Sequence, residues 1–178
     1  NDNQYGSLVT RKEWGAVEPK KPSSDLKVIP PQIVIVANTN GPTCATQSEC
    51  REIVRNIQIS VMSRGASDVP FNFLVGGDCN IYEGVGWNKT GNHTILFNDK
   101  SIGLAFIGSF MTSSPAQAQV DAGLAWLEQG VELNNLAPEY VVFVQKQVTP
   151  YESPGVLMIP FIKRWKHWSA NVSITDVI

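Results

Sequence analysis

The sequence predicts an α/β fold in which helices flank a mixed central β-sheet. Three apolar, β-branched runs at residues 32–37, 101–110 and 140–144 are typical of strands that are buried on both faces. Between them lie two segments, 49–62 and 115–131, whose apolar residues recur at helical spacing. Buried strands that alternate with helices along one chain form a sheet that the helices cover.

The first helix follows the first strand. Residues 18–31, rich in Pro, Lys and Ser, indicate a loop before that strand. Ser48 is a residue type that caps helices, and it precedes the helix predicted over 49–62. Apolar residues four positions apart then share one face; they are Ile53, Ile57 and Val61.

A hairpin is predicted next. Residues 71–75 are apolar and aromatic, and Gly76, Gly77 and Asp78 end this strand as turn formers. Residues 80–85 then supply the antiparallel partner. The hairpin makes the sheet mixed.

Two helices are predicted in the second half of the chain. Ser114 is expected to cap the first, and Pro115 to begin it. Its core stripe comprises Val120, Leu124, Leu127 and Val131. Ser153 and Pro154 indicate the start of the other helix, in which three aromatic residues share a face: Phe161, Trp165 and Trp168. Pro160 conflicts with an unbroken helix there, because it lacks an N–H donor.

Composition narrows the function classes. The 178 residues, 43% hydrophobic, suit one domain over 1–178, with 1–7 as a flexible N-terminal lead. A net charge of −2 argues against a nucleic-acid partner, which needs a basic face. No stretch reaches the ~20 apolar residues of a membrane span, and the first residues lack a signal-peptide pattern. Any signal or membrane anchor is therefore expected outside this sequence.

Cysteines and glycosylation sequons favour an extracellular protein. Cys44 and Cys50 are six residues apart, which suits a local disulfide better than zinc, since no second Cys/His pair stands at ligand spacing. Cys79 is then a buried free thiol or an intermolecular link. Sequons of the form Asn-X-Ser/Thr begin at Asn88, Asn92 and Asn171.

Four segments, in order along the chain, resemble those of peptidoglycan recognition proteins. They are 8–15 (Leu-Val-Thr-Arg, then Glu-Trp-Gly), 73–87 (Phe-Leu-Val-Gly-Gly-Asp, Ile-Tyr-Glu-Gly, Gly-Trp), 101–108 (Ser-Ile-Gly-Leu-Ala-Phe-Ile-Gly) and 147–155 (Gln-Val-Thr-Pro, then Glu-Ser-Pro-Gly). The Cys44–Cys50 pair stands where this family has its common disulfide. The resemblance runs from Leu8 to Trp168 and is greatest to insect long-form receptors with LC-like ectodomains.

The resemblance implies a zinc-amidase fold. Catalytic members cleave the bond between N-acetylmuramic acid and L-alanine, with zinc held by two His and one Cys and assisted by a Tyr. The three ligand positions hold Ala37, Gln145 and Ser153 here, and the Tyr position holds Phe71. Methyl and phenyl groups cannot bind zinc, and a neutral amide is a poor ligand. We therefore expect no cofactor and no amidase activity.

Other catalytic interpretations are weaker. The two histidines, His93 and His167, lack ligand spacing, so we expect ordinary polar roles, with His167 on a surface helix. Ser153 has no neighbouring base and suits a helix cap better than a nucleophile. Asp78 and Glu83 are a carboxylate pair of the kind that cleaves glycosides, but acidic residues beside a Gly-Gly turn are more often turn formers.

The former cleft is expected to remain as a binding surface. Relatives that recognise diaminopimelate-type peptidoglycan share a Gly-Trp pair and an Arg that binds the extra carboxylate. Gly65-Ala66 and Val85 stand at these positions here, Val61 replaces a groove His, and Arg64 is the residue that can compensate. Further candidates for groove or partner contacts are Thr39, Trp87, His93, Leu96 and Phe97, the last two as exposed apolar residues or as loop packing. A glycan on Asn88 or Asn92 would crowd the cleft.

The leading hypothesis is a non-catalytic innate immune receptor or co-receptor ectodomain. It would bind a diaminopimelate-type muropeptide weakly and act by pairing, as a heterodimer, with a related recognition protein that holds the ligand. We expect it outside the cell, on a plasma-membrane receptor or secreted. The alternatives are a zinc-dependent N-acetylmuramoyl-L-alanine amidase and a decoy that sequesters ligand or partners.

Overall fold

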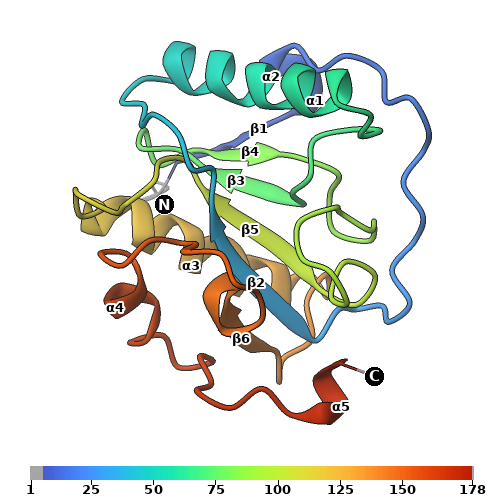
Figure 1. The fold of residues 1–178 in the computed structure, drawn as a ribbon, viewed down its shortest axis with the longest axis vertical. Coiled ribbons are helices and arrows are strands. Elements are labelled where there is room, and N and C mark those ends of the chain that lie inside the picture. Colours follow the sequence, from blue (N-terminus) through green and yellow to red (C-terminus); the bar gives the residue numbers. More distant parts are fainter. Residues whose placement is uncertain (1–5, 178) are drawn as a thin grey trace.

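One mixed β-sheet forms the centre of the computed structural model, which describes residues 6–177 (Figure 1). Within these residues the strand order is β1-β4-β3-β5-β2-β6. The strands are β1 (Leu8–Val9), β2 (Ile33–Asn38), β3 (Phe73–Val75), β4 (Ile81–Glu83), β5 (Ile102–Phe106) and β6 (Val141–Val144). β3 and β4 pair antiparallel as the predicted hairpin, and the other neighbours pair parallel. The predicted mixed α/β architecture is confirmed.

Helices cover both faces of the sheet. They are α1 (Arg11–Trp14), α2 (Gln47–Ser63), α3 (Gln117–Glu132), the 3-10 turn η1 (Gln145–Gln147), α4 (Ile159–Ile162) and α5 (Ile174–Val177). Leu104 and Phe106 of β5 pack in the core cluster that contains α3, while Ala105 between them packs in the cluster that contains α1 and α2. Alternate strand residues therefore point to opposite layers. None of the helices in the described part of the chain has the length and hydrophobicity needed to cross a membrane.

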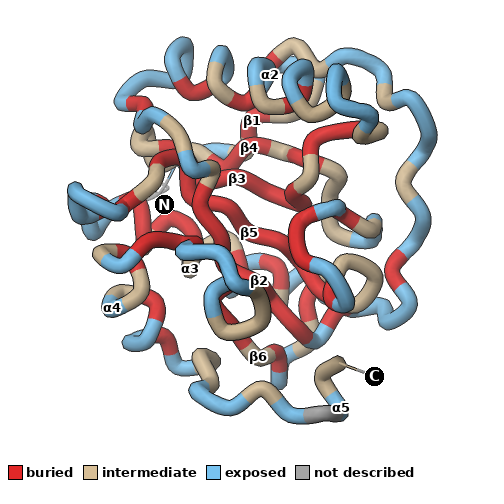
Figure 2. The backbone as a smooth tube through the Cα atoms, in the orientation of Figure 1, coloured by how far each residue is buried: buried red, intermediate tan, exposed pale blue. Residues whose placement is uncertain are grey.

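The core lies on the central strands. All residues of β2 and β5 are buried, and Figure 2 shows this continuous buried band between exposed helices. Strands enclosed on both faces are apolar throughout rather than alternating, which is why their sequences predicted them well. The structured strands are shorter than predicted: β5 ends at Phe106 rather than at Phe110, and β3 begins at Phe73 rather than at Phe71.

Two helix starts differ from the prediction. Thr46, not Ser48, caps α2: its hydroxyl accepts from the Glu49 N–H, and the Glu49 carboxylate accepts from the Thr46 N–H. This reciprocal capping box satisfies two backbone donors, which a cap two residues later would leave free. The other is α3, which begins at Gln117 after Ala116, without a side-chain cap, so the predicted Ser114–Pro115 start is two residues early.

The last predicted helix starts later than expected. Ser153 and Pro154 lie in a loop, and α4 begins at Ile159. Pro160 falls in its first turn, where a missing N–H breaks no helical bond, so it begins this helix instead of kinking it. Of the three aromatic residues predicted to share a face, Trp165 is buried, and Phe161 and Trp168 pack partly buried against the same core.

The N-terminal segment contains two elements that the sequence pattern did not predict, β1 and α1. Of the predicted flexible lead, 1–5 lie outside the described residues. Ser7 is held in place, because its N–H donates to Asn80 Oδ1 at 2.9 Å and its carbonyl accepts from the Ile81 N–H at 3.1 Å.

A fully buried amide, Asn72, joins the sheet to the loop that follows β4. Its side-chain Oδ1 accepts from the Gly103 N–H at 2.8 Å, and the backbone N–H of Asn72 donates to the Gly103 carbonyl at 3.0 Å. Its Nδ2 donates to the carbonyls of Gly86 and Lys89 at 2.8 and 2.7 Å. The Asn72 side chain thus pairs backbone groups of Gly103, Gly86 and Lys89 that would otherwise need a neighbouring strand as their partner.

We predict that Asn72→Ala lowers the free energy of unfolding by about 2–4 kcal/mol, because the buried Gly103 N–H loses its partner together with two carbonyls. Denaturant unfolding measures the change. Asn56→Ala on the exposed face of α2 is the control and should stay within about 0.5 kcal/mol of wild type. Equal stability of the two variants would contradict the proposed role of Asn72.

Candidate functional site

The positions assigned to the family's metal ligands meet at one edge of the sheet. Ala37 lies near the end of β2, and Gln145 directly follows β6, which pairs parallel with β2. Ser153 reaches the same edge, because its Oγ accepts from the Asn38 N–H at 2.9 Å and its carbonyl accepts from the Lys146 N–H. Phe71 belongs to the same core cluster as Ala37. All four residues are buried.

The polar side chains at this edge are used in bonds within the protein. Ser153 accepts from the backbone of β2 and caps no helix, so the predicted helix cap is wrong. Gln145 Nε2 donates to the His93 carbonyl at 2.7 Å and to Thr94 Oγ1 at 3.3 Å. Ser153 therefore fastens the loop after η1 to β2, and Gln145 fastens the start of η1 to the 93–94 loop.

The residues gathered here do not fit zinc. A methyl group, a carboxamide and a hydroxyl offer none of the imidazole or thiolate donors that zinc prefers. Among residues 6–177 no group of three or more His, Cys, Asp or Glu side chains is arranged to hold a metal ion.

His93 is a buried wall residue rather than the ordinary polar histidine that was expected. Its Nδ1 lies 2.8 Å from Thr94 Oγ1, and its ring covers Gly103, where a Cβ would lie 2.4 Å from the His93 ring. Burial lowers the pKa of His93 to about 4, so the ring is neutral near pH 7. Its Nε2 has no hydrogen-bond partner within the described part of the chain.

His167 was predicted to lie on a surface helix, and this is wrong. It follows α4 in a turn and is half-buried. Its ring stacks on Tyr140 with centroids 3.9 Å apart, and its Nδ1 lies 2.7 Å from the Tyr140 carbonyl oxygen. This contact holds the C-terminal segment beside the start of β6, whereas the sheet edge described above lies at the end of that strand.

A cavity of about 410 Å³, here called the apolar groove, lies between α2 and the segments that flank β2 and β3. Its lining residues are Thr39, Pro42, Ile53, Asn56, Ile57, Ser60, Val61, Arg64, Pro70 and Phe71. Four predicted residues thus come together: Thr39, Val61, Arg64 and Phe71. Arg64 is the charged member of the lining. Sequence reasoning missed Asn56 and Ser60, which helical spacing places on one face of α2 because they are four residues apart.

A second cavity of about 290 Å³, here called the hydroxyl pocket, adjoins the groove at Pro70. Its lining residues are Lys21, Pro22, Ser23, Ser24, Ser67, Asp68, Val69, Val85, Thr90, Gly91 and Asn92. The Asn92 N–H donates to the carbonyl of Pro70, a groove residue, at 2.8 Å. Gly65 and Ala66 form the turn after α2 that leads to Ser67. Val85 and the sequon residue Asn92 therefore line the same pocket.

Two residues predicted as groove or partner contacts lie elsewhere. Trp87 packs on the α3 side of the sheet, with ring centroids 4.8 Å from Phe73 and 5.7 Å from Trp126. Phe97 is buried among Ile33, Ile35 and Phe143, which agrees with the loop-packing alternative and not with an exposed contact, whereas its neighbour Leu96 is 64% exposed. Two adjacent apolar residues of one loop thus differ in burial, Phe97 in the core and Leu96 in solvent, and the apolar pattern of the sequence does not distinguish them.

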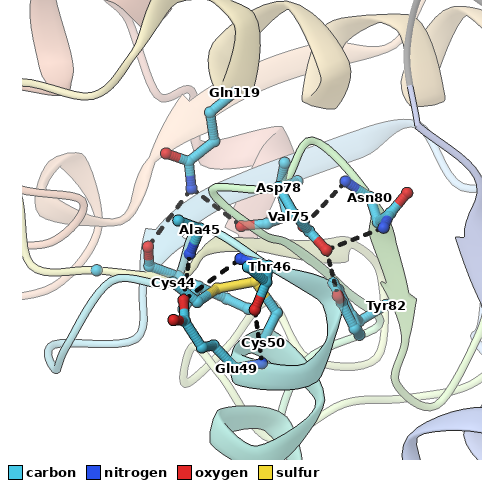
Figure 3. Close-up of a disulfide and its surroundings, with 12 residues drawn as sticks. Cys44, Ala45, Thr46, Glu49, Cys50, Val75, Asp78, Asn80, Tyr82 and Gln119 are labelled. Atoms are coloured by element: carbon cyan, nitrogen blue, oxygen red, sulfur yellow. Dashed lines mark hydrogen bonds between the residues drawn. A yellow bond between two sulfur atoms is a disulfide. The ribbon is translucent and has the colours of Figure 1, made fainter.

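The predicted disulfide between Cys44 and Cys50 is present, and it holds the loop after β2 to the first turn of α2 (Figure 3). The hairpin turn packs closely against it, since a Cβ on Gly77 would lie 2.0 Å from the Cys44 carbonyl oxygen. Cys79 is a free, half-buried thiol whose pKa is raised by burial and then by Asp78 and Asp121.

The carboxylates of the alternative glycosidase interpretation serve local structure. Asp78 accepts from the Tyr82 hydroxyl at 2.5 Å and from Asn80 (Figure 3). Glu83 accepts from the Arg11 N–H at 3.0 Å. Asp68, which sequence reasoning missed, is bound at 2.9 Å by Arg11 and at 2.9 Å by the Gln58 amide. These bonds fix the N-terminal segment to α2 and to the floor of the hydroxyl pocket.

Comparison with known proteins identifies the family. The N-acetylmuramoyl-L-alanine amidase family (Amidase_2) matches residues 27–155. A peptidoglycan recognition protein of Bombyx mori is 40% identical over 166 residues, which are 93% of this chain and 84% of that protein.

Two solved structures share the fold. One is the ectodomain complex of peptidoglycan recognition proteins LCa and LCx with bound tracheal cytotoxin: TM-score 0.89, 35% identity, 93% of this chain and 99% of that chain covered. The other is peptidoglycan recognition protein LE in complex with tracheal cytotoxin, a monomeric diaminopimelic acid-type peptidoglycan: TM-score 0.87, 32% identity, 91% and 95% covered. The strand order, the disulfide and these matches agree, and the chain belongs to the peptidoglycan recognition protein family with its amidase-type fold.

Proposed function

We propose that this chain is a non-catalytic recognition or co-receptor ectodomain for bacterial peptidoglycan fragments. The observation that carries the proposal is the chemistry at the sheet edge where Ala37, Gln145 and Ser153 meet. Zinc catalysis needs a metal that polarises the amide and activates water, and these side chains are poor zinc donors. Ser153 and Gln145 are instead bound to the backbone of Asn38 and His93.

The alternative function, a zinc-dependent N-acetylmuramoyl-L-alanine amidase, is favoured by the matching family alone. It requires a donor set that the described residues do not assemble. The imidazole of His93, whose carbonyl binds Gln145, is buried and has its Nδ1 2.8 Å from Thr94 Oγ1.

The ligand class follows from the solved relatives, two of which hold tracheal cytotoxin. We infer weak binding of such a muropeptide by this chain alone. The cations that line the cavities, Arg64 and Lys21, are both exposed, and Val85 offers no charge to a ligand carboxylate. An unpaired ligand carboxylate would lose solvation without a compensating ion pair.

We propose that the chain acts through a partner, a related recognition protein that already holds the muropeptide. The LCa–LCx complex with one cytotoxin is a precedent among relatives for two recognition domains in one assembly. Partnering of the LC type, as a heterodimer, suits a groove whose lining is mainly apolar and whose one cation, Arg64, is exposed. The exposed Leu96 is a candidate contact.

An extracellular location fits the disulfide and the three exposed sequon asparagines, Asn88, Asn92 and Asn171. We propose an ectodomain of a plasma-membrane receptor, or a secreted protein, with N-glycans. A decoy that binds partners without signalling would use the same surfaces.

The purified chain is predicted to contain no stoichiometric zinc and to leave a diaminopimelate muropeptide uncleaved, as measured by metal analysis and by mass spectrometry of the products. The triple variant Ala37→His, Gln145→His, Ser153→Cys is the control that defines the site. It should bind about one equivalent of zinc and melt at a higher temperature with the metal than without it. Chelator-sensitive cleavage by the wild-type chain would establish the amidase instead.

Calorimetry with the monomeric muropeptide should give a Kd of about 1 mM or weaker for this chain alone. Added to a related recognition domain saturated with the same muropeptide, the chain should bind at least about a hundredfold more tightly, because the partner then presents the ligand. Tight binding to the free muropeptide, or no binding to the loaded domain, would defeat the partner proposal.

Replacing Val85 by Arg should increase affinity for the free muropeptide by about tenfold or more, because a charge-assisted bond to a carboxylate contributes about 1.5–3 kcal/mol. Bacterially produced protein without N-glycans is used, so that nothing is attached near the pocket. Val17→Arg adds the same charge at an exposed position outside both cavities and serves as the control. Equal effects of the two variants would show that net charge, not position, governs binding.

A further inference from the structure

The three sequons differ in their relation to the binding surface. Asn92 lies on the lining of the hydroxyl pocket, whereas Asn88 and Asn171 belong to the lining of neither cavity described above. The carbonyl of Asn88 accepts from the Leu26 N–H at 3.0 Å, and its side chain is exposed beyond the pocket. A glycan on Asn92 therefore starts inside this surface, and one on Asn88 starts outside it.

The hydroxyl pocket has the chemistry of a sugar site. Four hydroxyl side chains, those of Ser23, Ser24, Ser67 and Thr90, line it together with the apolar side chains of Pro22, Val69 and Val85. A sugar ring with an acetamido group presents the matching surfaces: hydroxyls and an amide to the polar side, a methyl and ring C–H groups to the apolar side. At about 290 Å³ the pocket lies at the lower end of ligand-binding cavities, the size for a single sugar.

The walls of the pocket are held by bonds that leave it open. The Thr90 N–H donates to the Ser24 carbonyl at 2.8 Å, and the Lys20 N–H donates to the Ser67 carbonyl at 2.9 Å. On the floor, Asp68 is fixed by Arg11 and Gln58. A site with walls already in place loses little conformational freedom when a sugar enters it.

We propose that the first N-acetylglucosamine of an N-glycan on Asn92 occupies the hydroxyl pocket and closes the Val85 end of the binding surface to free muropeptide. This inference rests on the proposed extracellular function, because N-glycans are added along the secretory route. Because the sugar is covalently linked to Asn92, its binding in the pocket is intramolecular. Contacts too weak to hold a free sugar are then sufficient. Asn92 is well placed to direct the sugar, since its backbone is fixed to Pro70 between the two cavities.

The experiment compares wild type with Asn92→Gln and Asn88→Gln, all secreted from insect cells. The sequon is removed at Asn92 and not at Thr94, because Thr94 is buried and bonded to His93 and Gln145. Glycopeptide mass spectrometry gives the occupancy of each site. Hydrogen exchange then follows the amides of Ser23 and Ser24, which donate no hydrogen bond within residues 6–177 and are covered only if the pocket is filled.

Asn92 should be glycosylated, and the amides of Ser23 and Ser24 should exchange several-fold more slowly in wild type and Asn88→Gln than in Asn92→Gln. Trimming the wild-type glycan to one N-acetylglucosamine should keep the slow exchange. An unmodified Asn92, or equal exchange in wild type and Asn92→Gln, would overturn the proposal. Calorimetry on wild-type protein is a separate readout: tight muropeptide binding there would refute the proposed function, whatever the exchange rates show.

Discussion

The buried amide of Asn72 is the contact on which the walls of the binding surface depend. β3 is short, and the chain beside it must turn away from the sheet without leaving backbone groups unpaired. Asn72 resolves this by bonding Gly103 in β5 on one side and Gly86 and Lys89 on the other. The loop that carries Val85, Asn92 and His93 is thereby attached to the most buried part of the molecule. Hydrogen bonds of one buried side chain thus hold this loop to β5, although it has no regular secondary structure.

Hydrogen bonds within the chain also join the segments at which the family's metal ligands would stand. A metal ligand holds together the segments that supply it, so its proposed loss would leave those segments needing another connection. Here Ser153 bonds to the end of β2, and Gln145 bonds to the 93–94 loop. Each junction thus has a bond that does not depend on a metal ion.

The sequence predicted the buried strands and α2 because burial on two faces, or on one helical stripe, imposes a composition that shows directly. It failed where a residue's role depends on a distant partner. Thr46 caps α2 because Glu49 reciprocates, and Pro160 lies in the first turn of α4, where its missing N–H breaks no helical bond. Trp87 was expected in the groove, but its ring packs directly on Gly130 of α3. Any larger residue at position 130 would clash with the ring. Asn72 was visible as a polar residue in an apolar run, yet its three side-chain hydrogen bonds reach residues 14 to 31 positions away.

The two cavities differ in the chemistry of their linings, one mainly apolar and the other rich in hydroxyls, and this difference limits which ligands can bind. The apolar groove has one guanidinium, exposed at Arg64, while the hydroxyl pocket has its carboxylate, Asp68, already neutralised by Arg11. A free peptide with several carboxylates would have to give up water at both cavities for ion pairs with two exposed cations, Arg64 in the groove and Lys21 in the pocket, and exposed pairs contribute little. A ligand whose charges are already bound by another protein carries no such cost. Its apolar and sugar portions are what remain to be covered, and these match the lining that this chain retains.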